Sequence, residues 1–292
     1  MKMIITALLV LAMAGISEAA IKVVTSLPDL ADLARQVGGD KVSVESIVRE
    51  DQNPHFVEVK PSNMMKLKSA NLFLTIGMEL EMWAPQIVDG SRNASLIVVD
   101  LSRGVTKIEV PANVDASQGD VHRYGNPHYW LDPRNVRAII DEIVNALIRV
   151  SPADEKMFRA NADAYVQKLA GKIQSWEATM KPFAGRKIVT FHKSWSYFAK
   201  WLGLEVVGEV EPKPGIAPSP SHSAELIALV RSAGIKAIVV EPFYDLSAPE
   251  QIARATGAKV VVLPTSSGGV EQVRDYIGLI DYDVSILASV LK

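Results

Sequence analysis

The order of apolar and polar positions divides most of the chain into two similar halves. In the first half, short apolar runs of strand length alternate with stretches of helical periodicity, which is typical of βα units around a mostly parallel sheet. The strand-like runs are 21–26, 42–48, 71–77 and 95–100, and a helical pattern covers 28–37. We therefore predict an α/β lobe in this half, with a core of its own.

A second set of strand-like runs follows a long helical interval. Residues 133–180 carry almost no strand signal, and 153–180 is predicted to be one helix in which Gly171 is the only weak position. Beyond it, strands are predicted at 186–191, 204–208, 235–241 and 258–264, and helices at 195–202, 224–233, 249–256 and 272–291. The predicted fold class is α/β, with two Rossmann-like lobes of mostly parallel sheets joined by a long rigid backbone helix.

The N-terminus has the pattern of a secretory signal peptide. A lysine precedes a short apolar run, and small residues follow, with a cleavage site expected near Ala19 or Ala20. The run is too short to be a stable membrane anchor. The expected organisation is therefore a signal peptide at 1–20, an N-terminal lobe at 21–150, a connecting helix at 151–184 and a C-terminal lobe at 185–292.

Composition narrows the class of protein further. The chain has 292 residues, a net charge of −2 and no cysteine. A charge this close to zero gives no basic surface for nucleic acid. An exported chain without cysteine has no disulfides, and any metal it binds must be held by nitrogen and oxygen. We expect a soluble, monomeric protein of a bacterial periplasm.

The chain contains the sequence Asn-Pro-His followed by an aromatic residue twice. The two copies place His55 before Phe56 and His128 before Tyr129. Proline fixes its own φ and restricts the residue before it, so each histidine extends from a stiff stub. A single copy would be interpreted as a loop histidine. Two copies in one lobe favour a shared binding site.

Two further ionisable residues follow predicted strands of the second lobe. His192 comes directly after 186–191, and Glu241 ends the run 235–241. In open α/β sheets, ligands bind outside the carboxyl ends of the strands. Both lobes are therefore predicted to direct ionisable groups into one cleft, where three imidazoles and a carboxylate suit tetrahedral zinc.

Three other polar residues receive weaker interpretations. His122 lies in a long polar loop at 105–125, where we expect it to be solvated, with a minor role in metal capture as the alternative. His222 is predicted to be a surface residue or part of the first turn of a helix. Asp132 precedes Pro133 at a helix start, so capping is its expected role.

Four segments together resemble the periplasmic metal-binding proteins of zinc and manganese ABC importers, the ZnuA/TroA-like family. They are NPHFVEVKPSN, NPHYWLDPRN, TFHKSWSYFAKWLGL and AIVVEPFYD with the following strand, and the likeness covers essentially the whole mature chain. The resemblance implies His55, His128 and His192 as metal ligands. The chain departs from the family pattern where an aspartate ligand is usual, since Thr265 stands there, and its loop is not rich in histidine.

The predicted function is capture of a divalent metal ion, zinc first, and its delivery to an ABC permease, without catalysis. Three imidazoles favour Zn²⁺ over Mn²⁺, with Mn²⁺ and Fe²⁺ as alternatives. A zinc hydrolase with an open coordination position and Glu58 or Glu241 as base is the competing hypothesis. A binder of a chelated metal or vitamin is a third, and it requires a wider, aromatic cleft.

Overall fold

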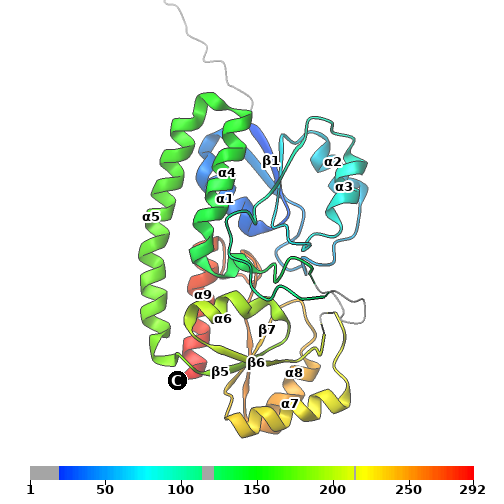
Figure 1. Cartoon of the computed structure of the whole chain (residues 1–292), viewed down its shortest axis with the longest axis vertical. Helices are drawn as coiled ribbons and strands as arrows, with labels where there is room; N and C mark the ends of the chain where they lie inside the picture. The colour runs from blue at the N-terminus through cyan, green and yellow to red at the C-terminus, as the bar shows by residue number, and fades with distance from the viewer. Residues whose placement is uncertain (1–19, 114–121, 214) are drawn as a thin grey trace, which may run out of the picture.

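The computed structural model describes residues 20–113, 122–213 and 215–292, which form two α/β lobes stacked along the long axis of the molecule (Figure 1). The described residues contain two four-stranded parallel sheets with the same strand order, β2-β1-β3-β4 and β6-β5-β7-β8. The predicted fold class is confirmed. The predicted signal peptide and residues 114–121 of the polar loop lie outside the described residues.

Every predicted apolar run coincides with a strand to within a few residues. The upper lobe has strands β1 (Ile21–Thr25), β2 (Val42–Ser46), β3 (Leu72–Thr75) and β4 (Ile97–Asp100), with helices α1 (Pro28–Gly38), α2 (Pro61–Lys68) and α3 (Ala84–Ser91). The lower lobe has strands β5 (Lys187–Thr190), β6 (Glu205–Glu209), β7 (Ala237–Val240) and β8 (Lys259–Val262), with helices α6 (Ser196–Leu202), α7 (Pro220–Ala233), α8 (Ser247–Thr256) and α9 (Tyr276–Leu291).

The position of each strand in its sheet explains its residue pattern. Strands β3 and β7 lie inside their sheets and are buried at every position, because neighbouring layers cover both faces. Strands β2 and β4 lie at the edges of the upper sheet, and half-buried positions alternate with exposed ones along them. The run at β4 is continuously apolar in sequence, yet Val98 is 49% exposed at this edge.

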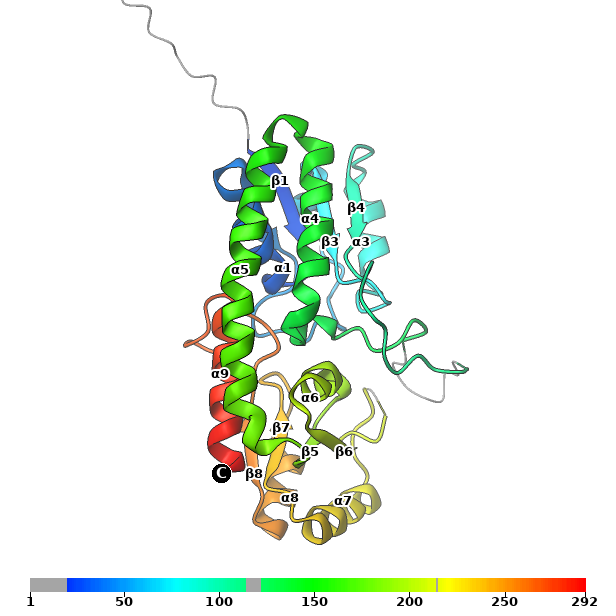
Figure 2. The ribbon, with the colours of Figure 1, turned by 60° about the vertical axis from the view of Figure 1, so that its left-hand side comes forward.

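Helices α4 (Val136–Val150) and α5 (Glu155–Met180) lie along one side of the molecule. Helix α5 has 26 residues and contacts α1 and α4 of the upper lobe and α9 of the lower lobe, so it runs along both (Figures 1 and 2). Single 3₁₀ turns at Pro152–Asp154 and Lys181–Phe183 flank it. Gly171 faces open space and does not interrupt the helix.

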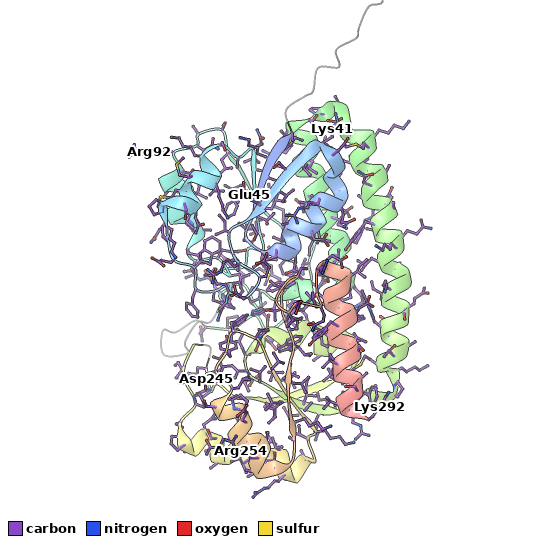
Figure 3. The ribbon with its side chains drawn as sticks, turned by 180° about the vertical axis from the view of Figure 1, so that it is seen from behind. Lys41, Glu45, Arg92, Asp245, Arg254 and Lys292 are labelled. Carbon is purple, nitrogen blue, oxygen red and sulfur yellow. The ribbon has the colours of Figure 1, made fainter. Side chains whose placement is uncertain are left out.

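The apolar core does not divide between the lobes as predicted. One cluster of buried residues extends from Leu30 and Phe73 of the upper lobe, through Trp130, to Trp195 and Leu279 of the lower part of the chain. A smaller second cluster packs beneath α7 and α8 on the outer side of the lower sheet. The expectation of separate cores is therefore wrong, because α5, which contacts elements of both lobes, and α9, which packs against it, both contribute buried apolar side chains to the single cluster. Figure 3 shows these two helices side by side from behind.

The segment between β8 and α9, together with the first residue of α9, joins the lower lobe to the upper one through hydrogen bonds. The backbone N–H and hydroxyl of Ser267 donate to Asp29 Oδ1, at 2.9 and 2.6 Å. The Trp130 indole N–H donates to the carbonyl of Thr265 at 2.9 Å, and the Tyr276 hydroxyl donates to the Trp130 carbonyl at 2.5 Å. These hydrogen bonds are buried, so breaking one would leave polar groups without partners, and each therefore stabilises the junction of the lobes.

Two helices begin elsewhere than the pattern predicts. Helix α9 begins at Tyr276 because the Asp275 carboxylate accepts a hydrogen bond from Gly278 N–H and caps it. Helix α7 begins at Pro220 because Ser219 caps it, so the end of the proline-rich stretch at 211–223 is helical. Within the part of the chain that the structure describes, no helix is both long and apolar enough to span a membrane.

Candidate metal centre

The two Asn-Pro-His copies hold their histidines in the same way. The side-chain oxygen of Asn53 accepts a hydrogen bond from His55 N–H at 3.0 Å, and that of Asn126 accepts one from His128 N–H at 2.9 Å. Each asparagine therefore fixes the backbone of the histidine two residues later, beyond what proline alone restricts. The sequence interpretation credited only the proline.

Asn126 also determines which nitrogen of His128 is available. Its side-chain oxygen, already an acceptor, lies 2.9 Å from His128 Nδ1, so Nδ1 carries the proton and Nε2 carries the lone pair. Burial, and then the proximity of His55, His192 and His122, hold the pKa of His128 well below its usual value. This imidazole is therefore neutral at neutral pH, as metal coordination requires.

The third histidine reaches the same point from the lower lobe. His192 follows β5 after one residue, and its Nδ1 is in short contact with Glu211 Oε1, which leaves Nε2 for a ligand. Its ring centroid lies 5.2 Å from that of His55 and 5.3 Å from that of His128. The three side chains come from segments far apart in the chain, two of the upper lobe and one of the lower lobe, and meet where the lobes adjoin.

The three histidines form a compact, buried group. Their exposed fractions are 8% for His55, 2% for His128 and 4% for His192. One ring nitrogen from each lies within 4.8 Å of the others, and His55 Nε2 is 3.1 Å from His128 Nε2. Zinc–nitrogen bonds of 2.0–2.1 Å in a tetrahedron separate the nitrogens by about 3.4 Å. Small side-chain movements would give that spacing, so the residues fit a bound divalent metal.

Glu241 lies at the carboxyl end of β7, as predicted, but outside this group. Its side chain is fully buried, and burial raises its pKa to about 7, against the opposing effect of His192 and Ser194. Neither oxygen reaches a hydrogen-bond partner of good geometry among the described residues. Glu241 therefore faces His192 without belonging to the three-histidine group.

The other residues considered in the sequence analysis lie outside the group of three histidines. Glu58 is exposed and pairs with Lys60 at 3.0 Å, away from the histidines. Asp132 accepts from Arg134 N–H, so its predicted capping role is confirmed. His222 lies in the first turn of α7, also as predicted. Thr265 is buried, and its backbone carbonyl is engaged by Trp130.

The expectation that His122 is solvated is wrong. It is only 9% exposed, and its ring stacks on that of His55, with centroids 5.1 Å apart. The polar composition of its loop gave no indication of this, because a contact with His55, far away in the sequence, leaves no local pattern. Glu211 was missed as well, although it follows β6 as Glu241 follows β7. The strand-end rule would have identified it, because it lies two residues after the end of β6.

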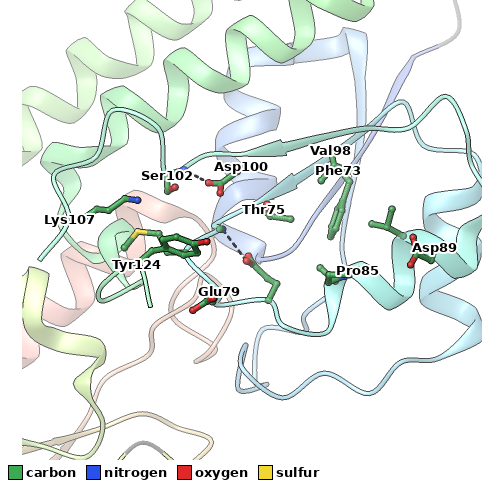
Figure 4. A pocket seen from close by; sticks show the side chains of 15 residues that line it. Phe73, Thr75, Glu79, Pro85, Asp89, Val98, Asp100, Ser102, Lys107 and Tyr124 are labelled. Atoms are coloured by element: carbon green, nitrogen blue, oxygen red, sulfur yellow. Dashed lines mark hydrogen bonds between the residues drawn. The ribbon is translucent and has the colours of Figure 1, made fainter. Parts of the chain in front are cut away.

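A separate crevice of about 490 Å³ opens in the upper lobe, between α3 and the carboxyl ends of β3 and β4 (Figure 4). Tyr124 and Glu79 line it, and Arg123 N–H donates to Glu79 at 2.7 Å. Since His122 stacks on His55, residues 122–124 separate this crevice from the histidines. Among the described residues, only the three histidines meet the geometric requirements of a metal-holding group, so the crevice is not the metal centre.

Known proteins of this fold carry metals. A zinc-uptake protein ZnuA of Bacillus subtilis is 24% identical over 89% of this chain and 83% of its own length. The iron-binding protein YfeA of Yersinia pestis is 28% identical (91% and 85% covered), and the manganese-binding lipoprotein MntA of Halalkalibacterium halodurans is 26% identical (93% and 89% covered).

Solved structures agree with this likeness at the level of the fold. A crystal structure of ZnuA superposes with a TM-score of 0.82 over 94% of this chain and all of that one, at 24% identity. A manganese-bound periplasmic metal-binding protein from Candidatus Liberibacter asiaticus gives 0.79 over 93% and 99%, at 23% identity. Residues 23–290 match the family described as zinc-uptake complex component A, periplasmic. The chain belongs to this family of metal-binding solute-binding proteins, which are not enzymes.

Proposed function

We propose that this protein captures one divalent transition-metal ion, zinc first, in the cleft between its lobes and delivers it to an ABC permease. It does so as a soluble periplasmic monomer, after removal of a signal peptide near Ala19 or Ala20. The observation that carries the proposal is the buried group of His55, His128 and His192, drawn from both lobes. Family membership sets the hydrolase alternative aside.

The ligand chemistry supports zinc over its rivals. Three imidazoles suit zinc, whereas manganese prefers a larger share of oxygen ligands. The relatives are named for zinc, manganese and iron, so the family alone does not select the metal. The small, almost closed site also favours a bare ion over a chelate or vitamin, because all three histidines are nearly buried.

A fourth ligand completes the site in this proposal. Glu241 is the first candidate because it is buried beside His192 and its oxygens are not held by other groups with good geometry. Water is the next candidate, since three-ligand zinc keeps an open position. His122 is a third, because its ring already lies against that of His55.

Metal content measured on protein purified from periplasm without chelator tests the proposal directly. We expect one metal ion per chain, and competition across zinc, manganese, iron, nickel and copper then ranks the cargo. Protein that holds no metal and binds none of these ions above a buffer control contradicts the proposal.

The fourth ligand is tested by cobalt substitution, because Co²⁺ absorption in the visible range reports coordination number and ligand type. We expect Glu241→Gln to change this spectrum and His122→Ala to leave it unchanged. Glu58→Gln is the matched control, since it removes an exposed carboxylate that pairs with Lys60 and lies only three residues after His55 in the sequence. A spectrum that is unchanged in both Glu241→Gln and His122→Ala assigns the position to water, and a change in His122→Ala alone assigns it to His122.

A further inference from the structure

One buried carboxylate beside the metal centre has contacts that metal coordination by the histidines does not explain. Glu211 is 5% exposed, and its Oε1 is in short contact with His192 Nδ1. Its other oxygen, Oε2, accepts a hydrogen bond from Gly215 N–H at 3.1 Å. Its backbone N–H donates to the carbonyl of Phe191, the residue before His192, at 3.2 Å. Glu211 is therefore held at three points around one histidine.

These contacts fix the ring of His192 in one orientation. A carboxylate is only an acceptor, so Nδ1 of His192 must carry the proton that the two groups share. Nε2 then faces the other two histidines with its lone pair. A free imidazole would divide its population between two tautomers and several ring orientations, and only part of it could bind metal.

The same carboxylate connects the two lobes. Gly215 has φ +77°, and a Cβ built on it would lie 3.7 Å from Cζ of Phe56, so its backbone approaches the Phe56 ring. Phe56 directly follows His55 in the upper lobe. Glu211 therefore contacts His192 and also holds a backbone N–H that lies close to Phe56, the residue next to His55.

We propose that Glu211 is a positioning residue, which sets the tautomer and orientation of His192 for metal capture and links that histidine to the His55–Phe56 segment across the cleft. This inference rests on the proposed function for its effect on metal affinity. Glu211 does for His192 what Asn126 does for His128, with a charged acceptor in place of a neutral one. Partners of this kind typically change metal affinity about 10–100-fold when removed.

The first test measures zinc affinity by chelator competition in Glu211→Ala and Glu211→Gln. We expect Glu211→Ala to weaken binding about 10–100-fold. Glu211→Gln should recover much of the loss, because its amide oxygen still accepts from Nδ1–H. His222→Ala is the matched control, since this histidine lies outside the site on α7. Unchanged affinity in Glu211→Ala overturns the proposal.

The second test uses metal-free protein, so it is independent of metal transport. Long-range ¹H–¹⁵N NMR correlations report the tautomer of each histidine. We expect His192 to be the Nδ1–H tautomer in the parent protein and a mixture in Glu211→Ala, with His128 unchanged. A parent protein that shows this pattern but binds no metal contradicts the proposed function and leaves the positioning role standing. A His192 tautomer that is the same in both proteins overturns the positioning role.

The third measurement separates positioning from direct coordination. In the cobalt-loaded protein, Glu211→Gln should keep the visible spectrum of the parent, because a positioning residue does not contact the metal. A spectrum with altered coordination number, together with affinity lost as fully in Glu211→Gln as in Glu211→Ala, makes Glu211 a ligand and overturns the proposal.

Discussion

The upper and lower lobes present their histidines by different means. In the upper lobe, His55 and His128 extend from Asn-Pro stubs, and the neutral side chains of Asn53 and Asn126 hold them. In the lower lobe, His192 follows the end of a strand and is flanked by buried carboxylates. The upper lobe therefore supplies rigid geometry, and the lower lobe supplies geometry together with negative charge.

This difference indicates that the positive charge of a bound metal ion would be balanced by the buried carboxylates of the lower lobe. A buried carboxylate without a cation is unfavourable because it has lost its hydration. The raised pKa of Glu241 is a direct sign of that cost. A divalent ion between the lobes would offset this cost, so a bound metal would stabilise the lower lobe more than the upper lobe. The following predictions test this asymmetry.

The largest effect is expected from removing a ligand. His128→Ala and His192→Ala should each lower zinc affinity by more than the roughly 10–100-fold that is typical of partners outside the coordination shell. Isothermal titration with a competing chelator measures it, and His222→Ala is the control. Because one apolar core joins the lobes, melting temperatures of the metal-free variants should stay close to that of the parent. A variant that unfolds but still binds zinc would assign that histidine a structural role.

A smaller effect is expected from the asparagines. Asn126 contacts both the backbone N–H and Nδ1 of His128, whereas Asn53 accepts from the backbone of His55 and donates to the hydroxyl of Tyr244. Asn126→Ala should therefore weaken zinc binding about 10-fold or more, and Asn53→Ala less. Equal losses in the two variants would show that backbone positioning, not tautomer selection, is the main role of the stub.

The charge of the lower lobe is tested by the pH dependence of stability in metal-free protein. The pKa of Glu241 is raised from 4.5 to about 7, so the folded state binds its proton more tightly than the unfolded state. Stability from this group is present below about pH 4.5 and is lost as pH rises through 7. At 1.36 kcal/mol per unit, the shift corresponds to at most about 3 kcal/mol.

Glu241→Gln should therefore stabilise the metal-free protein at pH 8 and have little effect at pH 5, as measured by chemical unfolding at both values. Glu58→Gln, at an exposed carboxylate, is the control and should show no such difference. A Glu241→Gln variant that is less stable than the parent at pH 8 would contradict the idea that the buried carboxylate destabilises the metal-free protein.

The smallest effect is expected from removing one of the hydrogen bonds that join the lobes. Tyr276→Phe removes the hydroxyl that donates to the Trp130 carbonyl, at a cost of about 1 kcal/mol in unfolding free energy. Tyr282→Phe, on the same helix, is the matched control, since Tyr282 is only partly buried. If Tyr276→Phe lowers both the stability and the zinc affinity, this hydrogen bond also helps to align His128, two residues before Trp130. Equal stability in both variants would contradict a structural role for this bond.

The sequence allowed the architecture and the three histidines to be predicted for identifiable reasons. Apolar runs of strand length mark β3 and β7, and the strand-end rule places His192 and Glu241 at the cleft. The burial of His122 could not be predicted in this way. The strand-end rule also applies to Glu211, but it does not say that this side chain contacts His192. Both contacts join residues that are not neighbours in the chain, and local periodicity carries no information about which such residues meet.

The shared apolar core was also beyond local patterns. Periodicity identifies which face of a helix is apolar, but α5 and α9 each present apolar side chains that either lobe could have covered. Only the folded chain shows that one cluster extends through both lobes. The two lobes look alike in sequence pattern and strand order, yet they are not independent units.

That continuous core limits how this chain can recombine. Two lobes with the same strand order invite the idea of exchanging one for the corresponding lobe of a relative, to obtain a carrier with a different metal preference. Such a hybrid would bring together halves of a core that had never packed against each other. Changes in preference are therefore more accessible through single side chains around the cleft, such as Glu211 and Glu241, than through the transfer of a whole lobe.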